Sequence, residues 1–324
     1  MPGTTINRST PDKWKQDIAQ SVDLYNSWFM EFAPKTYREM RVKTAKSVKL
    51  AMKATNGFMY VSRELLKENP KILPILRMST CPPLARDRLI GLARVSKTLV
   101  ESMEDSSNPR IPPRISIDII DGNLDRICDL VMRMIDPDII VWLNRSKPAT
   151  RVEISRAATI IADRLCGAVS DPIIRNAQEK RQLNAIGDWL CMRGYRQTGG
   201  CKFSEMNPGT FSFRTNIPVS LTSGNEPESV NIPVDVVIMP IKSQEGDLPL
   251  LIEAKSAGDY TNVNKRRKEE AQKMAQLRNT YGDDVRFGLF LCGYFDSGYL
   301  GYEAAEGIDW VWEHRIDDLA MYEL

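Results

Sequence analysis

The spacing of hydrophobic and polar residues predicts alternating helices and strands in the second half of the chain. A helix is predicted to begin with Asp171 as its N-cap and Pro172 at its first position, and to end at Gly194. Apolar runs predict strands over residues 211–219, 231–239, 249–255 and 285–291, and helical periodicity predicts a helix over 265–280. The order helix, three strands, helix, strand indicates a mixed α/β fold.

The first 170 residues are predicted to be mainly helical and carry no catalytic motif. Residues 14–32 have an amphipathic pattern. Lysines then recur at helical spacing, at Lys43, Lys46, Lys49 and Lys53. Such a stripe suits the phosphates of a DNA duplex, although a solvated helix face explains it more simply. We expect two domains, a helical region for DNA binding or dimerisation over residues 1–170 and a catalytic core over residues 171–324.

Three charged residues stand in apolar runs that predict buried strands. Asp235 lies inside one such run, and Glu253 and Lys255 end the next one. Alternation along a strand puts Glu253 and Lys255 on one face. The stretch 240–247 between the runs is polar and turn-rich, so the two strands can be antiparallel neighbours. Two carboxylates and one ammonium can therefore converge.

These residue types at this spacing point to a magnesium site. A buried carboxylate without a partner costs a large part of a domain's stability, and a divalent cation removes that cost. We expect Asp235, Glu253 and the backbone carbonyl of Ala254 to bind Mg²⁺, a hard ion that prefers carboxylates, water and substrate phosphate. Lys255 would orient or deprotonate an attacking water and offset charge on the phosphate. The alternative is a set of charges that face solvent or form a salt bridge.

The spacing resembles the PD-(D/E)xK nuclease motif, in the form of Asp235, seventeen residues, and then Glu253-Ala254-Lys255. The proline of the motif stands one place early, at Pro233, which is a mild departure because proline contributes no ligand. The predicted order of helices and strands is the core arrangement expected of that superfamily. The resemblance implies metal-dependent hydrolysis of phosphodiester bonds.

A further acidic residue, Glu179, lies on the first predicted helix of this core. It is in line with Leu183, Ile186 and Leu190, which recur on the core-facing side of that helix. In nucleases that carry the motif, a helical glutamate at this place can hold a second metal ion or its water. Glu179 is therefore a candidate for that catalytic role. A peripheral glutamate paired with Arg175 or a neighbouring lysine is an equal alternative.

The second predicted helix follows the strand of Lys255 and begins with a run of cations. Its members are Lys265, Arg266, Arg267 and Lys268. Beside a phosphate-cleaving centre, this run predicts contacts to the DNA backbone or to guanine edges. The packing face is predicted to comprise Ala271, Met274 and Leu277. Glu269 and Glu270 are expected to dilute the charge, and a solvated helix face is the competing interpretation for each residue.

Arg86 and Arg88 form another candidate DNA contact, in the helical region. Two guanidinium groups held apart by Asp87 could read bases. They could equally belong to a salt-bridged helix turn that follows Pro82 and Pro83. Both interpretations stay open.

Longer blocks of sequence resemble a narrower family, the XamI type of type II restriction endonuclease. The blocks are residues 162–168, 171–179, 253–259 and 291–302, within a likeness from about Arg86 to Leu319. The resemblance implies a Mg²⁺-dependent homodimer that cuts both strands of a short palindrome in double-stranded DNA, with GTCGAC as the site associated with that family. It also implies a cognate DNA methyltransferase in the same system, without a stable complex.

Composition neither demands nor excludes this function. The chain has 324 residues, enough for a large core, and its net charge of +2 is mild for a DNA-binding protein. No Cys-x-x-Cys pair is present and His314 is the single histidine, which disfavours zinc fingers, His-based metal nucleases and Ser-His or Cys-His hydrolases. Because we find no signal-peptide pattern and no apolar run of membrane length, we expect a cytoplasmic protein without membrane contact.

Two other functions remain open. A repair or junction-resolving nuclease could use the same core on branched or damaged DNA. A DNA-binding regulator could keep the fold without cleaving, although the presence of Asp235, Glu253 and Lys255 together argues against it. Discrete plasmid fragments would separate a restriction enzyme from both.

Overall fold

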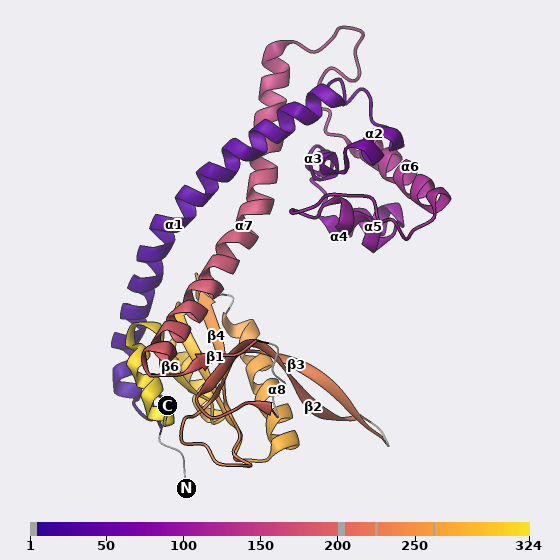
Figure 1. Cartoon of the computed structure of the whole chain (residues 1–324). Helices are drawn as coiled ribbons and strands as arrows, with labels where there is room; N and C mark the ends of the chain where they lie inside the picture. The colour runs from indigo at the N-terminus through magenta and orange to yellow at the C-terminus, as the bar shows by residue number, and fades with distance from the viewer. Residues whose placement is uncertain (1–4, 200–204, 224–225, 262) are drawn as a thin grey trace. The chain divides into compact units, whose positions relative to one another are not determined.

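The computed structural model describes residues 5–199, 205–223, 226–261 and 263–324, without the side chains of residues 221–223, 226–228 and 264–267. The chain forms two compact units (Figure 1). We call them the helical unit, Ala33–Ile173, and the sheet unit, which combines Met1–Phe32 with Ile174–Leu324. The expected division was a single boundary near residue 170, whereas the structure assigns the first 32 residues to the sheet unit.

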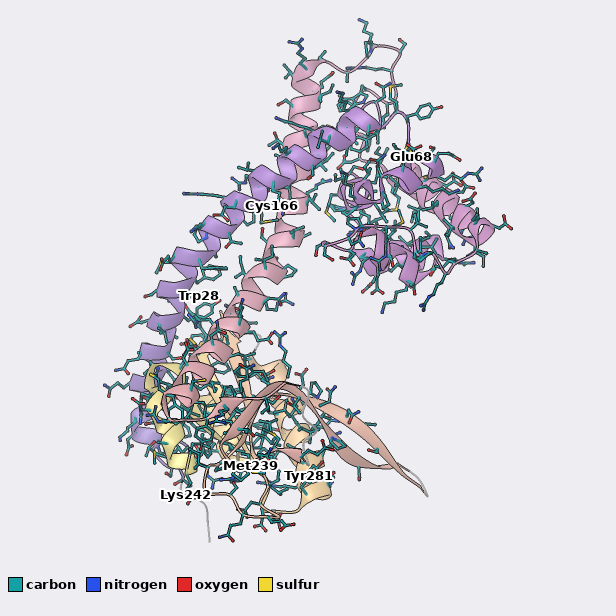
Figure 2. The ribbon with its side chains drawn as sticks, in the orientation of Figure 1. Trp28, Glu68, Cys166, Met239, Lys242 and Tyr281 are labelled. Carbon is teal, nitrogen blue, oxygen red and sulfur yellow. The ribbon has the colours of Figure 1, made fainter. Side chains whose placement is uncertain are left out.

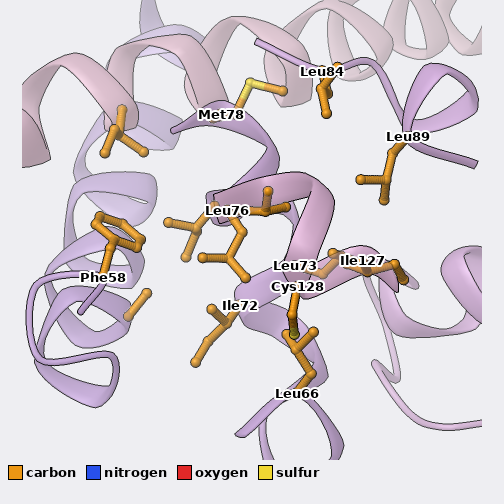
Figure 3. Packing of buried hydrophobic residues seen from close by; sticks show 14 of the residues in the cluster. Phe58, Leu66, Ile72, Leu73, Leu76, Met78, Leu84, Leu89, Ile127 and Cys128 are labelled. Atoms are coloured by element: carbon orange, nitrogen blue, oxygen red, sulfur yellow. The ribbon is translucent and has the colours of Figure 1, made fainter. Parts of the chain in front are cut away.

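The helical unit contains short helices between parts of two long ones. In chain order these are α1 (Pro11–Ala54), α2 (Arg63–Glu68), η1 (Pro70–Ile72), α3 (Leu73–Met78), α4 (Arg86–Ala93), α5 (Lys97–Met103), α6 (Ile117–Met134) and α7 (Arg151–Met192). Ser62 and Ser96 cap α2 and α5, since each serine oxygen accepts a backbone N–H of the first turn. The apolar faces meet in one core, shown in Figure 3, around residues such as Phe58, Leu76 and Ile127.

A buried ion pair joins α3 to the end of α5. Arg77 donates through Nε and Nη2 to the two carboxylate oxygens of Glu104, each at 2.6 Å. Its Nη1 donates to the carbonyl of Leu84. The Arg77 and Glu104 side chains are 9% and 8% exposed, so each charge depends on the other for its stabilisation.

α7 is longer than the sequence predicted. The expected start at Asp171 and Pro172 was wrong, because the helix runs from Arg151 to Met192 and contains Pro172. Proline removes one helical hydrogen bond, but apolar residues before and after it are buried in the unit cores, and this packing outweighs the local signal. The predicted end is confirmed at Gly194, which has a φ of 88°. Although α7 has 42 residues, neither it nor another described helix is apolar enough to span a membrane.

The sheet unit is built on a six-stranded mixed sheet. Its strands lie in the order β1 (Arg196–Gln197), β2 (Thr210–Ser223), β3 (Glu226–Met239), β4 (Leu250–Ala257), β5 (Arg286–Gly293) and β6 (Asp309–Trp312). β2, β3 and β4 are antiparallel neighbours, while the other pairs are parallel. The unit also holds α8 (Val263–Tyr281), α9 (Ser297–Ala305) and η3 (Glu313–Tyr322). The predicted mixed α/β character and the antiparallel hairpin are therefore confirmed.

Alternate residues of the central strands enter two hydrophobic layers. On one face of the sheet, Ile252 belongs to a cluster with Ile186 of α7. On the other face, Leu251 belongs to a cluster with Leu277 of α8. The loop between β3 and β4 lies at the edge of this unit and carries the exposed Lys242 (Figure 2).

The residues before α1 are bonded to the last strand of the sheet. Asp309 of β6 accepts hydrogen bonds from the backbone N–H groups of Ile6 and Asn7, at 2.6 and 2.9 Å. The Asn7 side chain donates to the carbonyl of Trp310 at 2.8 Å. These contacts explain why the start of the chain belongs to the sheet unit.

Candidate active site

β3 and β4 bring the predicted acidic residues together where their pairing ends. The strands pair only as far as Val236 and Ile252. Beyond that point, Oδ2 of Asp235 accepts a hydrogen bond from the N–H of Ala254 at 2.9 Å, in place of a strand-to-strand bond. Asp235 is therefore tied to the backbone next to Glu253, at the open end of the strand pair.

Glu253 and Lys255 lie on the same face of β4, as the alternation predicted. Nζ of Lys255 is 3.1 Å from Oε1 of Glu253. Their side chains are 17% exposed for Lys255 and 10% for Glu253. An ion pair is thus present, as in the alternative interpretation, but it is largely removed from solvent.

Two residues of α8 extend this ion pair, and the sequence analysis did not identify them. Nζ of Lys273 lies 2.8 Å from Oε2 of Glu253 and donates to the carbonyl of Pro233 at 2.9 Å. Oε1 of Glu270 lies 2.9 Å from Nζ of Lys255. Glu253 and Lys255 of β4 therefore each form an ion pair with a residue of α8.

The interpretation of Glu270 as a charge that dilutes the basic run was wrong. Glu269 is exposed, whereas Glu270 is buried. The signal was present in the spacing, because Glu270 precedes the core residues Met274 and Leu277 by four and seven positions, which places all three on one helical face.

Burial and neighbouring charges shift the pKa of Asp235 and of Lys255. Burial, followed by the charge of Glu253, raises the pKa of Asp235 from 3.8 to about 6. Burial by itself would lower the pKa of Lys255, but the charges of Glu253 and Glu270 raise it above its usual value. Lys255 is therefore an ammonium at neutral pH, while the Asp235 carboxylate is disfavoured by its burial and by the negative charge of Glu253.

These donors fit Mg²⁺. Within the described residues, no group of three or more His, Cys, Asp or Glu side chains is arranged around a metal position. Mg²⁺ needs only one or two carboxylates, and Asp235 and Glu253 supply them. The carbonyl of Ala254 points to the same side of β4 as its N–H, which bonds Asp235, so a third hard oxygen faces this opening. A cation there would offset the burial and the repulsion from Glu253 that raise the pKa of Asp235.

Replacing Asp235 with asparagine is expected to stabilise the protein at neutral pH without divalent cations. Because the pKa of Asp235 is raised on folding, the unfolding free energy falls as pH rises from about 4 to about 6. Asparagine keeps an oxygen for the Ala254 N–H and carries no charge, so the expected gain near pH 7 is roughly 3 kcal/mol. Urea unfolding in EDTA at acid and neutral pH measures it, and a gain of equal size at both pH values would contradict the explanation.

Glu179 lies near the site but bonds an arginine. Its Oε1 accepts from Nε and Nη2 of Arg214 at 3.0 and 2.7 Å, so among the described residues its partner is Arg214 and not Arg175 or a lysine. Arg214 lies on β2, one residue from the partner of Val236. The charge of Glu179 contributes to the raised pKa of Asp235, which places it within electrostatic reach. Its role toward a second metal ion stays a prediction.

The structure places only some of the predicted DNA contacts. The backbone of residues 265–267 lies in the first turns of α8, but the side chains of Lys265, Arg266 and Arg267 lie outside the described residues. Arg86 lies 3.7 Å from a carboxylate oxygen of Glu101, in line with the salt-bridged alternative. Arg88 is exposed on α4. Contact of these residues with DNA stays a prediction.

Two carboxylates and an ammonium at one opening of the sheet are groups that an enzyme for metal-assisted hydrolysis of phosphodiesters can use. The XamI restriction endonuclease family matches residues 56–312, and the chain belongs to that family. It is 50% identical to the type II restriction enzyme SalI of Streptomyces albus G over 317 residues, which cover 97% of this chain and 98% of that protein. No solved structure matches the chain. The expected family and enzyme class, a type II site-specific endonuclease, are confirmed.

Proposed function

We propose that this protein hydrolyses both strands of a short palindrome in double-stranded DNA, with Mg²⁺ as its cofactor and with GTCGAC as the target that the family resemblance implies. The observation that carries the proposal is the bond between Asp235 and the Ala254 N–H, beside the ion pair of Glu253 and Lys255, which is largely removed from solvent. These groups supply what metal-assisted hydrolysis of a phosphodiester requires.

Asp235, Glu253 and the carbonyl of Ala254 would hold the cation. When bound, Mg²⁺ polarises the scissile phosphate and lowers the pKa of the attacking water. Lys255 is held as an ammonium, so it donates hydrogen bonds. In this proposal it positions the attacking water and stabilises the negative charge that grows on the phosphate. Glu179 would bind a second metal ion or its water.

The proposed DNA target also implies partners for the protein. A palindrome has twofold symmetry, so a homodimer would present one site to each strand. A cognate methyltransferase, acting without a stable complex, would protect the same sequence in the cytoplasm. The cations of α8 and of α4 would contact the duplex. They are Lys265, Arg266, Arg267, Arg86 and Arg88.

Digestion of a mapped plasmid tests this function. With Mg²⁺ the protein is expected to yield discrete fragments whose sequenced ends lie at GTCGAC, and EDTA is expected to prevent cutting. A plasmid that differs by one base pair in each such site is the control and should stay intact. Preference for branched DNA would instead favour the junction-resolving nuclease, and binding without cutting would favour the regulator.

A further inference from the structure

Four side chains form a line of alternating charge between α8 and β4. Lys273 contacts Glu253 at 2.8 Å, Glu253 contacts Lys255 at 3.1 Å, and Lys255 contacts Glu270 at 2.9 Å. The two inner members are the predicted catalytic residues. The two outer members come from one face of α8, three positions apart, where helical side chains are neighbours.

Glu270 is the most enclosed member of this line. Its side chain is 2% exposed, and within the described part of the chain its Oε2 has no hydrogen-bond partner. Glu303 of α9 is also buried, and its pKa is raised to about 8, first by burial and then by the charge of Glu270. Among the described residues, the ion pair with Lys255 is therefore the contact that Glu270 makes with a positive charge in this enclosed place.

The attachment of α8 to the sheet does not require that charge. Val263, Met274 and Leu277 already bury apolar surface of α8 against strand residues such as Leu251 and Leu289. A buried ion pair stabilises a fold no better than apolar side chains of similar size do. A lysine, in contrast, has a long flexible stem, and catalysis requires its ammonium to be held in one place. Orientation of Lys255 therefore accounts for a carboxylate at this position better than stability does.

We propose that Glu270 is a positioning residue that holds the ammonium of Lys255 toward the scissile phosphate. Glu270 acts through Lys255, and Lys273 holds Glu253 in the same manner from the next turn of α8. The inference rests on the proposed function, because it assumes that Lys255 acts in phosphodiester hydrolysis.

The substitution Glu270→Gln tests the inference, because it keeps the shape of the side chain and removes its charge. Single-turnover cleavage of a plasmid with Mg²⁺ is expected to slow by about ten- to a hundredfold, as a small misplacement of a catalytic group does. The dissociation constant for target duplex, measured by fluorescence anisotropy with Ca²⁺, is expected to stay unchanged. Glu269→Gln is the matched control, since Glu269 is exposed on the same helix. Its cleavage rate is expected to equal that of the unmodified protein.

A conservative variant separates orientation from folding. Glu270→Asp keeps the charge on a shorter side chain, and its rate is expected to lie between those of the unmodified protein and Glu270→Gln, with unchanged DNA binding. If Glu270→Gln does not fold, this variant decides alone. The inference is overturned if the folded Glu270 variants cut at the unmodified rate while Lys255→Ala is slowed a hundredfold or more. If Lys255→Ala itself cuts normally, the proposed function fails first.

Discussion

Replacing Lys255 with alanine is expected to slow DNA cleavage by about a hundred- to a thousandfold, since it removes the ammonium that stabilises the charge on the phosphate. Asp235→Ala is expected to abolish cleavage, because it removes a candidate ligand of Mg²⁺ and also the acceptor for the Ala254 N–H. Specific DNA binding is expected to persist in both variants, because neither residue is a predicted base contact.

Single-turnover digestion of a mapped plasmid in Mg²⁺ measures cleavage, and fluorescence anisotropy in Ca²⁺ measures binding. Lys242→Ala is a suitable control, because Lys242 is an exposed lysine in the loop between β3 and β4. Thermal unfolding is needed alongside, since loss of Lys255 leaves the buried Glu270 without its ion-pair partner. Full cutting by Asp235→Ala protein in Mg²⁺ would refute the assignment of the site.

Replacing Arg77 with methionine is expected to lower the unfolding free energy of the helical unit by about 3–5 kcal/mol, because it leaves the Glu104 carboxylate buried without a counter-charge. Urea unfolding read by hydrogen-exchange mass spectrometry of peptides from α3 and α5 measures this unit separately. The loss exceeds what the removed contacts alone would cost, since the desolvated charge that remains is the larger penalty.

The double variant Arg77→Met with Glu104→Leu provides the test of that reason. It removes both charges and is expected to recover most of the lost stability. Arg63→Met is the exposed counterpart, since Arg63 and Asp125 are 41% and 51% exposed. The unfolding free energy that Arg63→Met loses is expected to stay below about 1 kcal/mol. An Arg77→Met protein as stable as the unmodified one would show that the buried pair is not required.

Local patterns were sufficient to predict the strands that hold Asp235, Glu253 and Lys255. A period of two determines which face each residue takes, and a polar stretch of turn residues makes the two strands neighbours. Both properties involve residues close in sequence. Pro172 shows the limit of such reasoning, because a proline after Asp171 is a common helix start, yet the buried residues on both sides continue the helix.

Glu270 was missed for a different reason. A charged side chain in a helix is normally assigned to solvent, because burial without a partner is costly. Its partner, Lys255, lies on a strand fifteen positions earlier, and no local pattern joins the two. The line of alternating charges forms only in the folded protein, where residues of β4 and α8 lie in contact.

Asp309 accepts hydrogen bonds from the N–H groups of Ile6 and Asn7, and these bonds affect the order in which the two units can fold during synthesis. The helical unit is one continuous stretch, so it can fold as soon as it has emerged. Ile6, however, must wait for Asp309 of β6, which lies 303 positions later in the chain. We therefore expect the sheet unit to complete its fold later than the helical unit, and slowly, because contacts between residues so distant in sequence form late.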